Sequence, residues 1–570
     1  MIIKHLSISQ TDNKNLLIIL ILMLVAGILE VLSIGAVLPV FQLITKTGNI
    51  EENIIYIVLN KVINLKANRA DNYFLSNIII FFFVIIFFVK NFFLLCYSYF
   101  VSMFALKIET QLSVKLYDKY VSSSIIEISN RNSSEFIRNC LVQASSYANN
   151  FILTGITIAV ELITFLFITT FLLIKFPFET LVVCAFFCTF VIFYILFFKK
   201  KIYSLSKSTE EINEFRIRIL QEGIGAIKEL KIFDLKDEFL KKFFQQSFKI
   251  MRNSKILSLI RIFPRYFFEI FAVLLISFYV LISQFNNIEL TDILPQLTLF
   301  ALAALRIIPS LNRIITSSQR FKLSKPIVEN LYNELKDFKE LNLTNSTKKI
   351  NFVNQINLKN ISFIYPGSKE EVFFNLNLII NKNTTNFIYG ESGSGKSTLV
   401  EIILGLIKPN SGEVLVEDKN IFENIKDWQS NVGYVPQRIF LINTNIKKNI
   451  ILSEMDEDFR KEDFEKIISD CNIENLDLNE DVGENAKKLS PGQIQRVGVA
   501  RALYKKGTNL IVFDEITSSL DEHNTAEIMS NIKNLSKNFT ILFISHDKNL
   551  SKYFENKYEL KNKQITLIKD

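Results

Sequence analysis

Six long apolar runs fill the first half of this 570-residue chain and constrain its fold more than any other feature. Each is long enough to cross roughly 30 Å of hydrocarbon as a helix, where the backbone must satisfy its own hydrogen bonds. Hydrophobic residues make up 49% of the chain, 52 residues are phenylalanine, and the mean hydropathy is +0.25, values that favour a membrane part. We predict membrane-spanning helices at about residues 16–44, 74–104, 150–174, 178–199, 257–283 and 291–316.

The distribution of basic residues predicts the orientation of these spans. Residues 199–255 carry fourteen Lys and Arg, whereas residues 284–290 carry none and the turn between the third and fourth spans carries only Lys175. Excess positive charge stays in the cytoplasm, so both termini are expected there. This bias also accounts for the net charge of +8, so nucleic acid is not an expected partner.

The connections on the cytoplasmic side are long, polar and helix-periodic. They predict helices that continue beyond the membrane and turn near residues 125–135 and 210–220. A short amphipathic stretch at 54–59, in the first external loop, is expected to form a helix on the outer surface.

A glycine-rich turn in the second half, residues 390–397, lies between a β-rich run and a helical run. Glycines let successive backbone N–H groups point inward at phosphates, and the following helix adds the positive end of its dipole. Lys396 can reach the β- and γ-phosphates, and the Ser397 hydroxyl can bind Mg²⁺. A plain turn between a strand and a helix is the alternative, but the flanking elements favour a nucleotide site. Its residues are Gly390, Glu391, Ser392, Gly393, Ser394, Gly395, Lys396, Ser397 and Thr398.

The predicted fold is therefore a membrane all-α six-helix domain followed by an α/β P-loop NTPase domain. We assign residues 1–325 to the membrane domain, 326–350 to a charged, Asn/Thr/Lys-rich linker, and 351–570, where β-rich and helical runs alternate, to the α/β domain.

Two further motifs support the nucleotide site. The apolar run 510–513 ends in Asp514 and Glu515; Asp514 can hold Mg²⁺ through its water shell, and Glu515 can polarise a water for attack on the γ-phosphate. In the stretch 489–496, Ser490 can cap a helix, Pro491 suits its first turn, and Gln493 completes a capping-box spacing.

With these motifs the chain resembles the ATP-binding cassette family. The signature of that family reads Leu-Ser-Gly-Gly-Gln, and here Pro491 replaces its first glycine. The resemblance implies that the key contacts come from the Ser490 hydroxyl and the Gly492 amide, which both remain.

Other residues extend this resemblance. Tyr365 resembles the aromatic residue that stacks on adenine, Gln437 the loop glutamine that contacts Mg²⁺ and water, Asp521 the end of the loop after the catalytic acid, and His546 the switch histidine near the γ-phosphate. The resemblance implies ATP and Mg²⁺ as cofactors, ATP hydrolysis coupled to transport, and a P-loop that faces the signature helix of another cassette. One cassette and six spans per chain then imply a homodimer.

Four basic residues inside or near the predicted spans are candidates for the substrate cavity. Lys90, Arg265 and Arg306 lie about 15–18 residues from the external ends, or roughly 22–27 Å deep, and Arg313 shares a face with Arg306. Intramembrane charges usually face the bundle interior, so a cationic ring is expected to bind an anionic headgroup such as a pyrophosphate.

The alternative is neutralisation within the protein. Glu30, Glu161 and Glu269 also lie in spans, Arg265 and Glu269 are one turn apart, and Arg313 could extend to the interface.

Parts of the membrane half are similar to PglK-type flippases, which move lipid-linked oligosaccharides. These parts are residues 264–269 and 304–317, with Glu30 and Pro39 in the first span. The resemblance implies export of an anionic lipid-linked glycan, with membrane lipids as partners. A multidrug, lipid or peptide exporter of the same build, and a regulatory membrane ATPase that transports nothing, are the competing hypotheses.

Overall fold

The computed structural model describes residues 13–37, 40, 72–129, 131–285, 290–337, 349–452, 459–483, 486–517, 525, 529–530, 532 and 535–568. Contacts divide the chain into two compact units. The first is Met1–Val121 with Ser133–Phe338, and the second is Ser122–Asn132 with Lys339–Asp570. The stretch 54–59, predicted as a surface helix, and Asp521 lie outside the described residues.

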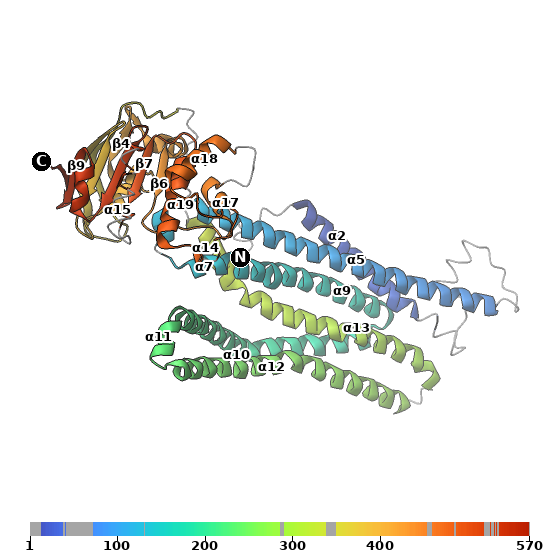
Figure 1. Ribbon diagram of the computed structural model, residues 1–570. Helices are drawn as coiled ribbons and strands as arrows, with labels where there is room; N and C mark the ends of the chain where they lie inside the picture. Colours follow the sequence, from blue (N-terminus) through green and yellow to red (C-terminus); the bar gives the residue numbers. More distant parts are fainter. Residues whose placement is uncertain are drawn as a thin grey trace. The chain divides into compact units, whose positions relative to one another are not determined.

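Within the described residues, the first unit holds six helices long and apolar enough to cross a membrane, which confirms the predicted six-helix domain. Several exceed what the hydrocarbon requires; α5, with 50 residues, is about 75 Å long at 1.5 Å per residue. The helices run side by side along the unit (Figure 1). Their bounds are α2 (Asn13–Gly35), α5 (Asn72–Val121), α9 (Thr154–Lys175), α10 (Pro177–Gly225), α12 (Lys236–Phe285) and α13 (Leu290–Leu323).

The third span belongs to a longer helical run that starts at Ser133. Two segments of this run are wound as π-helix, and the residues between the segments keep right-handed helical dihedrals. The elements before α9 are α7 (Ser133–Ile137), η3 (Arg138–Gln143), α8 (Ala144–Ser146) and η4 (Tyr147–Leu153).

The turns between the long helices fall partly where predicted. The short helix α6 (Ile125–Ser129) lies within the predicted turn at 125–135 and belongs to the second unit, where Ile126 packs against the core. The turn predicted at 210–220 is wrong, because those residues continue α10. The chain reverses instead around α11 (Ile227–Ile232), which joins α10 to α12 (Figure 1).

The physical reason for the shifted turn is the position of the residues that break a helix. Residues 210–220 contain no glycine or proline, whereas Gly223 and Gly225 end α10 and Asp234 adopts a left-handed φ of 52° before α12.

The predicted linker is also partly wrong, because its first half is a packed helix of the first unit, α14 (Lys325–Asp337). Val328 and Leu331 are buried in the hydrophobic core around α5 and η4. The Tyr120 hydroxyl donates to the buried Glu334 carboxylate over 2.9 Å. Composition alone identifies this segment as polar, but its apolar residues recur at helical spacing and bury one face.

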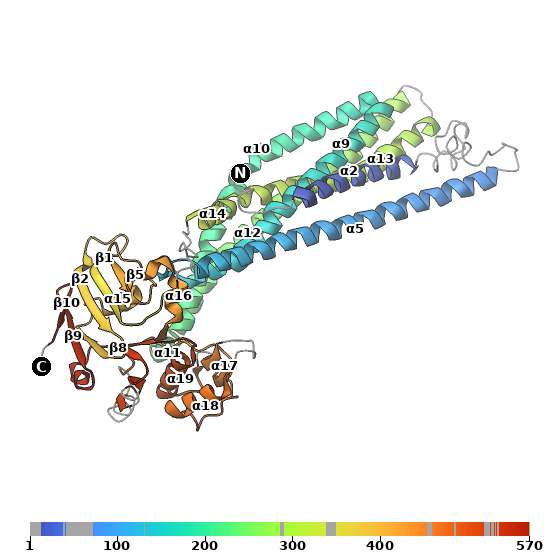
Figure 2. The ribbon, with the colours of Figure 1, turned by 90° about the horizontal axis from the view of Figure 1, so that it is seen from above.

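The second unit contains two sheets (Figure 2). Neighbours in the four-stranded sheet follow the order β2-β1-β4-β5 and are antiparallel; the six-stranded sheet has the order β10-β9-β3-β8-β7-β6 and is parallel except for β10. The strands are β1 (Gln355–Ile364), β2 (Glu371–Asn381), β3 (Thr385–Tyr389), β4 (Ser411–Val416), β5 (Lys419–Asn420), β6 (Val432–Val435), β7 (Leu510–Asp514), β8 (Thr540–Ser545), β9 (Asn556–Lys561) and β10 (Gln564–Leu567).

Alternation along β7 shows how the larger sheet is buried on both faces. Leu510 and Val512 enter one core with the helix α15 (Lys396–Ile403), and Ile511 and Phe513 enter another core on the opposite face. An apolar run without polar interruptions suits a parallel strand covered on both sides. The other helices are η5 (Ile421–Glu423), α16 (Ile425–Ser430), α17 (Ile446–Ile451), α18 (Lys461–Asp470), α19 (Pro491–Tyr504) and η8 (Lys548–Tyr553).

Candidate functional site

Four of the sequence motifs follow the carboxyl ends of four adjacent parallel strands. The P-loop follows β3, His546 follows β8, Glu515 follows β7, and Gln437 follows β6 two residues on. Carboxyl ends of parallel strands meet at one edge of a sheet, which is where α/β proteins bind ligands. Motifs that are up to about 160 residues apart in the chain are thereby brought to one place.

The P-loop requires glycine at particular positions. Gly393 and Gly395 have φ values of +82° and +100°, which side-chain-bearing residues rarely adopt. A Cβ at Gly395 would lie 2.8 Å from Val372 Cγ1, and one at Gly390 would lie 2.9 Å from the Leu560 carbonyl oxygen. The Ser394 hydroxyl is buried and has no hydrogen-bond partner among the described residues. A phosphate oxygen could supply that partner, so the loop fits a nucleotide.

Lys396, the first residue of α15, lies buried between the P-loop backbone and a carboxylate. Its Nζ donates to the carbonyl oxygens of Gly390 over 2.9 Å and Glu391 over 3.0 Å, and lies 3.5 Å from Glu515 Oε1. The charge is therefore held at the point where the P-loop and the end of β7 meet.

Glu515 contacts all three of the other functional side chains that surround it. Gln437 Nε2 donates to Glu515 Oε2 over 2.8 Å, and His546 Nδ1 lies 3.7 Å from Oε1. Glu515 has a left-handed φ of 49°, a costly conformation for a residue with a side chain. Its amide donates to the Ile544 carbonyl over 2.9 Å, which ties the strained residue to β8. The structure thus brings together the three predicted catalytic residues Glu515, Gln437 and His546.

Asp514 is the buried member of the acidic pair. Burial is the largest cause that raises the pKa of its carboxyl above the ordinary value, and the negative charge of Glu515 raises that pKa further. The Tyr434 hydroxyl, 3.4 Å from Oδ2, and the charge of Lys396 oppose this rise. A desolvated carboxylate with few donors is suited to a cation.

Sequence reasoning did not assign a role to Tyr434. The available signal was its place in the Gly433–Gln437 stretch, because β6 pairs with β7 and Tyr434 lies opposite Val512, two residues before Asp514.

The residues predicted to hold Mg²⁺ offer hydroxyl, carboxylate and amide oxygens, the ligand types that this ion prefers. Ser397 is exposed in the first turn of α15, Asp514 ends β7, and Gln437 follows β6. Their chemistry fits the ion.

The signature segment forms the predicted capping box. The Ser490 hydroxyl accepts from the Gln493 amide over 3.3 Å, and Gln493 Oε1 accepts from the Ser490 amide over 2.8 Å, with Pro491 in the first turn of α19. Gly492 occupies the second position of that helix. These contacts lie within the segment itself, so an anion role for this helix end remains a prediction.

Tyr365 lies against the P-loop helix. Its hydroxyl is 2.8 Å from Thr398 Oγ1, and its ring meets that of Phe363 edge to face with centroids 4.9 Å apart. Stacking of this ring on adenine remains a prediction.

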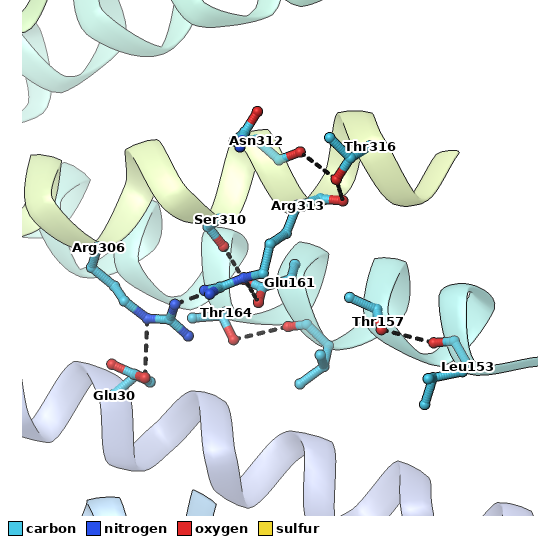
Figure 3. Close-up of polar contacts among 11 residues, drawn as sticks. Glu30, Leu153, Thr157, Glu161, Thr164, Arg306, Ser310, Asn312, Arg313 and Thr316 are labelled. Carbon is cyan, nitrogen blue, oxygen red and sulfur yellow. Dashed lines mark hydrogen bonds and ion pairs between the residues drawn. The ribbon is translucent and has the colours of Figure 1, made fainter. Parts of the chain in front are cut away.

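A second group of functional candidates is a charged cluster inside the first unit, of which Figure 3 shows Glu30, Glu161, Arg306 and Arg313. The Glu30 carboxylate of α2 lies 3.0 Å from Arg306 Nε and 3.6 Å from Lys90 Nζ. The Glu161 carboxylate of α9 lies 2.5 Å from Arg313 Nε and 3.9 Å from Arg306 Nη1, and accepts from the Ser310 hydroxyl. We call Glu30, Lys90, Glu161, Arg306 and Arg313 the charged cluster.

The predicted cationic ring is met only in part, and the pairing with Glu30, Glu161 and Glu269 that was its alternative is present. Arg265 does not join the cluster; it pairs with Glu269 one turn along α12 over 2.8 Å, and both side chains are exposed. Lys90, Arg306 and Arg313 do lie together, but around two carboxylates from facing helices. Sequence spacing places charges at similar depths without showing which opposite charges face them.

The fold and the site together define a P-loop nucleotide-binding protein whose chain also carries six span-length helices. Residues 373–518 match the family "ABC transporter". The structure resembles that of a bacterial Atm1-family ABC exporter with ATP bound, with a TM-score of 0.75 and 15% identity over 97% of this chain and 94% of the other. Residues 373–518 therefore carry an ABC transporter domain, and the chain as a whole has the half-transporter fold of membrane helices followed by one cassette.

Curated relatives match over part of their length. The ATP-dependent lipid A-core flippase 2 of Colwellia psychrerythraea (strain 34H / ATCC BAA-681) is 30% identical over 287 residues, which are 49% of this chain and 47% of that protein. The ATP-dependent lipid A-core flippase of Vibrio vulnificus (strain YJ016) is 33% identical over 199 residues, which are 34% of each chain. The matched region thus spans about half or less of these relatives.

Proposed function

We propose that this protein is an ATP-driven exporter that moves an anionic amphiphile, and specifically a lipid-linked glycan, outward across a bacterial inner membrane. The observation that carries the proposal is the meeting of Lys396, Gln437 and His546 around Glu515 in a chain that also has six span-length helices. An ATPase site joined to a membrane unit is the arrangement that active transport requires.

Each residue around Glu515 has a distinct role in this proposal. The P-loop amides and Lys396 bind the β- and γ-phosphates, and Glu515 orients and polarises the attacking water. Gln437 and His546 hold Glu515 in position and contact the water and γ-phosphate when nucleotide is bound. Mg²⁺ at Ser397, Asp514 and Gln437 would neutralise phosphate charge during transfer.

We further propose that two copies of the chain form the working unit. Ser490 and Gly492 lie at the exposed start of α19, where free helix N–H groups can bind an anion. A second copy would place this helix end against the γ-phosphate of the first, as the family resemblance implies. Hydrolysis would then require both copies, with the cassette and both termini in the cytoplasm.

The charged cluster supports an anionic substrate and also singles out one residue. It contains three cationic and two carboxylate side chains, so the set keeps a net charge of +1 although each cation has a carboxylate partner. The Arg313 side chain is 45% exposed, compared with 24% for Arg306 and 12% for Lys90. Arg313 is therefore the cluster residue that we propose meets a phosphate or pyrophosphate headgroup.

The same pairing is the observation that favours the second candidate function, a multidrug, lipid or peptide exporter. If Glu30 and Glu161 neutralise the cations permanently, the cavity has little attraction for an anion.

Reconstituted liposomes distinguish these functions. We expect a pyrophosphate-linked lipid to stimulate ATP hydrolysis and to cross the bilayer only with ATP. The substitution Arg313→Gln should raise the concentration of this lipid that half-saturates ATPase stimulation about tenfold, because one charge-assisted hydrogen bond is lost. Arg265→Gln, which removes an exposed arginine outside the cluster, is the matched control and should change it little.

Unchanged stimulation in Arg313→Gln would favour the second candidate. ATP hydrolysis without ATP-dependent movement of any lipid, drug or peptide tested would instead support a regulatory ATPase.

A further inference from the structure

A cavity of about 440 Å³ lies between α10 and α13, at the start of α14. Its walls are mostly apolar and include Ile202, Ile315 and Phe321. The size lies within the usual range for small-molecule sites. Hydrogen bonds fix two of the lining side chains, Tyr194 and Gln319. The buried Tyr194 hydroxyl donates to the Ile260 carbonyl over 2.7 Å and accepts from Gln319 Nε2 over 3.1 Å.

Four lysines line the same cavity: Lys199 and Lys200 from α10, Lys322 from α13 and Lys325 from α14. Among the lining residues that the structure describes, none is an aspartate or a glutamate. Among the described residues, no carboxylate lies within ion-pair distance of Lys199, Lys200 or Lys322, and Lys325 reaches Glu329 only at 4.0 Å. The cavity thus combines an apolar wall with an unneutralised cationic rim.

The lysines are also placed at one level of the bilayer. The fourth predicted span ends at Lys199, and the sixth ends at residue 316, so Lys322 lies about 9 Å beyond it at 1.5 Å per residue. Long lysine side chains reach toward the interface from such positions. With the proposed orientation this level is the headgroup layer of the cytoplasmic leaflet, which is the negatively charged one.

We propose that this cavity binds an anionic phospholipid of the cytoplasmic leaflet, with its phosphate among the lysines and an acyl chain against the apolar wall. The occupant is a resident membrane lipid and not the transported substrate. Because the cavity joins α10 to α13, a bound lipid favours arrangements in which these helices stay close. The proposal rests on the proposed orientation, but lipid binding can be measured without transport or ATP hydrolysis.

The chain offers a clean fluorescent reporter for the test. Its single tryptophan, Trp428, is fully buried in the core of the second unit. Tyr203 lines the cavity and is exposed, so Tyr203→Trp introduces an emission that brominated acyl chains can quench. The full-length protein is reconstituted in phosphatidylcholine and phosphatidylglycerol mixtures in which one lipid at a time is brominated.

We expect phosphatidylglycerol to be preferred at Tyr203→Trp by at least fivefold over phosphatidylcholine. Each lysine near an anionic headgroup contributes up to about fivefold, so Lys199→Gln with Lys322→Gln should lower the preference at least fivefold. The matched control is Lys201→Gln with Arg320→Gln, which removes the same charge from the same two helices at exposed positions outside the cavity. That variant should keep the preference.

A third variant tests the apolar wall. Ser318→Leu adds bulk inside the cavity and should reduce quenching by both lipids without changing basal ATP hydrolysis. Equal quenching by the two lipids in the parent, equal loss of preference in both double variants, or displacement of the brominated lipid by millimolar inorganic phosphate would each overturn the proposal.

Discussion

The nucleotide site and the charged cluster both place carboxylates among cationic side chains, but they use those charges differently. Glu515 is 18% exposed, and it faces a loop in which the buried Ser394 hydroxyl has no hydrogen-bond partner among the residues that the structure describes. Glu30 and Glu161 are only 5% and 7% exposed, and each holds two cationic partners. A site built for a ligand leaves polar groups incompletely paired, whereas the cluster satisfies most of its charge internally.

The backbone shows the same difference. In the nucleotide site Gly393, Gly395 and Glu515 have left-handed φ values, which cost glycine little but strain Glu515. The residues of the charged cluster lie inside regular helices and have no positive φ among the described residues. Strain at the first site positions groups for chemistry, while the cluster relies on helix packing to hold its charges.

Glu515→Gln gives the largest expected effect. Loss of the carboxylate should lower the rate of ATP hydrolysis about 10²–10⁴-fold, because a positioned base contributes that much. Nucleotide binding should remain, since the P-loop is intact. Hydrolysis rates and binding of a labelled nucleotide are measured together, with Glu413→Gln as the control at an exposed position of β4. If the variant hydrolysed ATP at the normal rate, Glu515 would not be the catalytic base, and the contrast with the charged cluster would lose its catalytic side.

Glu161→Gln should destabilise the first unit. Breaking a buried ion pair costs about 3–5 kcal/mol, and because Arg313 is half-exposed we expect about 2–3 kcal/mol here. Heating the full-length protein in detergent and following its monodisperse fraction measures the loss. Glu269→Gln is the matched control, since its pair with Arg265 is exposed, and it should change little. Equal stability of the two variants would mean that the cluster does not hold the helices together.

Gly395→Ala should destabilise the second unit more than Gly393→Ala. Both substitutions strain a left-handed φ, but an added Cβ has open space at Gly393 and meets Val372 and the buried Phe373 ring at Gly395. Such overpacking costs about 1–3 kcal/mol. Trp428 fluorescence during denaturant unfolding reports on the core of this unit. The difference between the variants isolates the steric part, and no difference would contradict the close packing of the P-loop.

Of the substitutions considered, Asp514→Asn should change stability least, and it should increase it. Folding raises the pKa of the Asp514 carboxyl, so its destabilising contribution is absent below the unfolded pKa and present in full above the folded pKa. Removing the charge should therefore raise the unfolding midpoint by about 1–3 °C at neutral pH, with less gain in acid. Mg²⁺-dependent nucleotide binding should weaken in the same variant. A lower unfolding midpoint at neutral pH would contradict the claim that burying the charged Asp514 carboxylate destabilises the fold.

The sequence determined the six-helix membrane part, the α/β domain and the individual nucleotide motifs. These features depend on local properties: the length of apolar runs, the conformational freedom of glycine, and capping spacing such as that from Ser490 to Gln493. Each can be recognised within a few residues because its physical cause acts over a few residues.

Tertiary structure decided which of these residues meet. It placed Tyr434 beside Asp514 through strand order, packed α14 into the first unit instead of leaving a linker, and gave Arg306 and Arg313 carboxylate partners from α2 and α9. Coulomb energy and desolvation depend on distances of a few ångströms between helices and strands far apart in the chain. Sequence spacing along one element does not contain those distances.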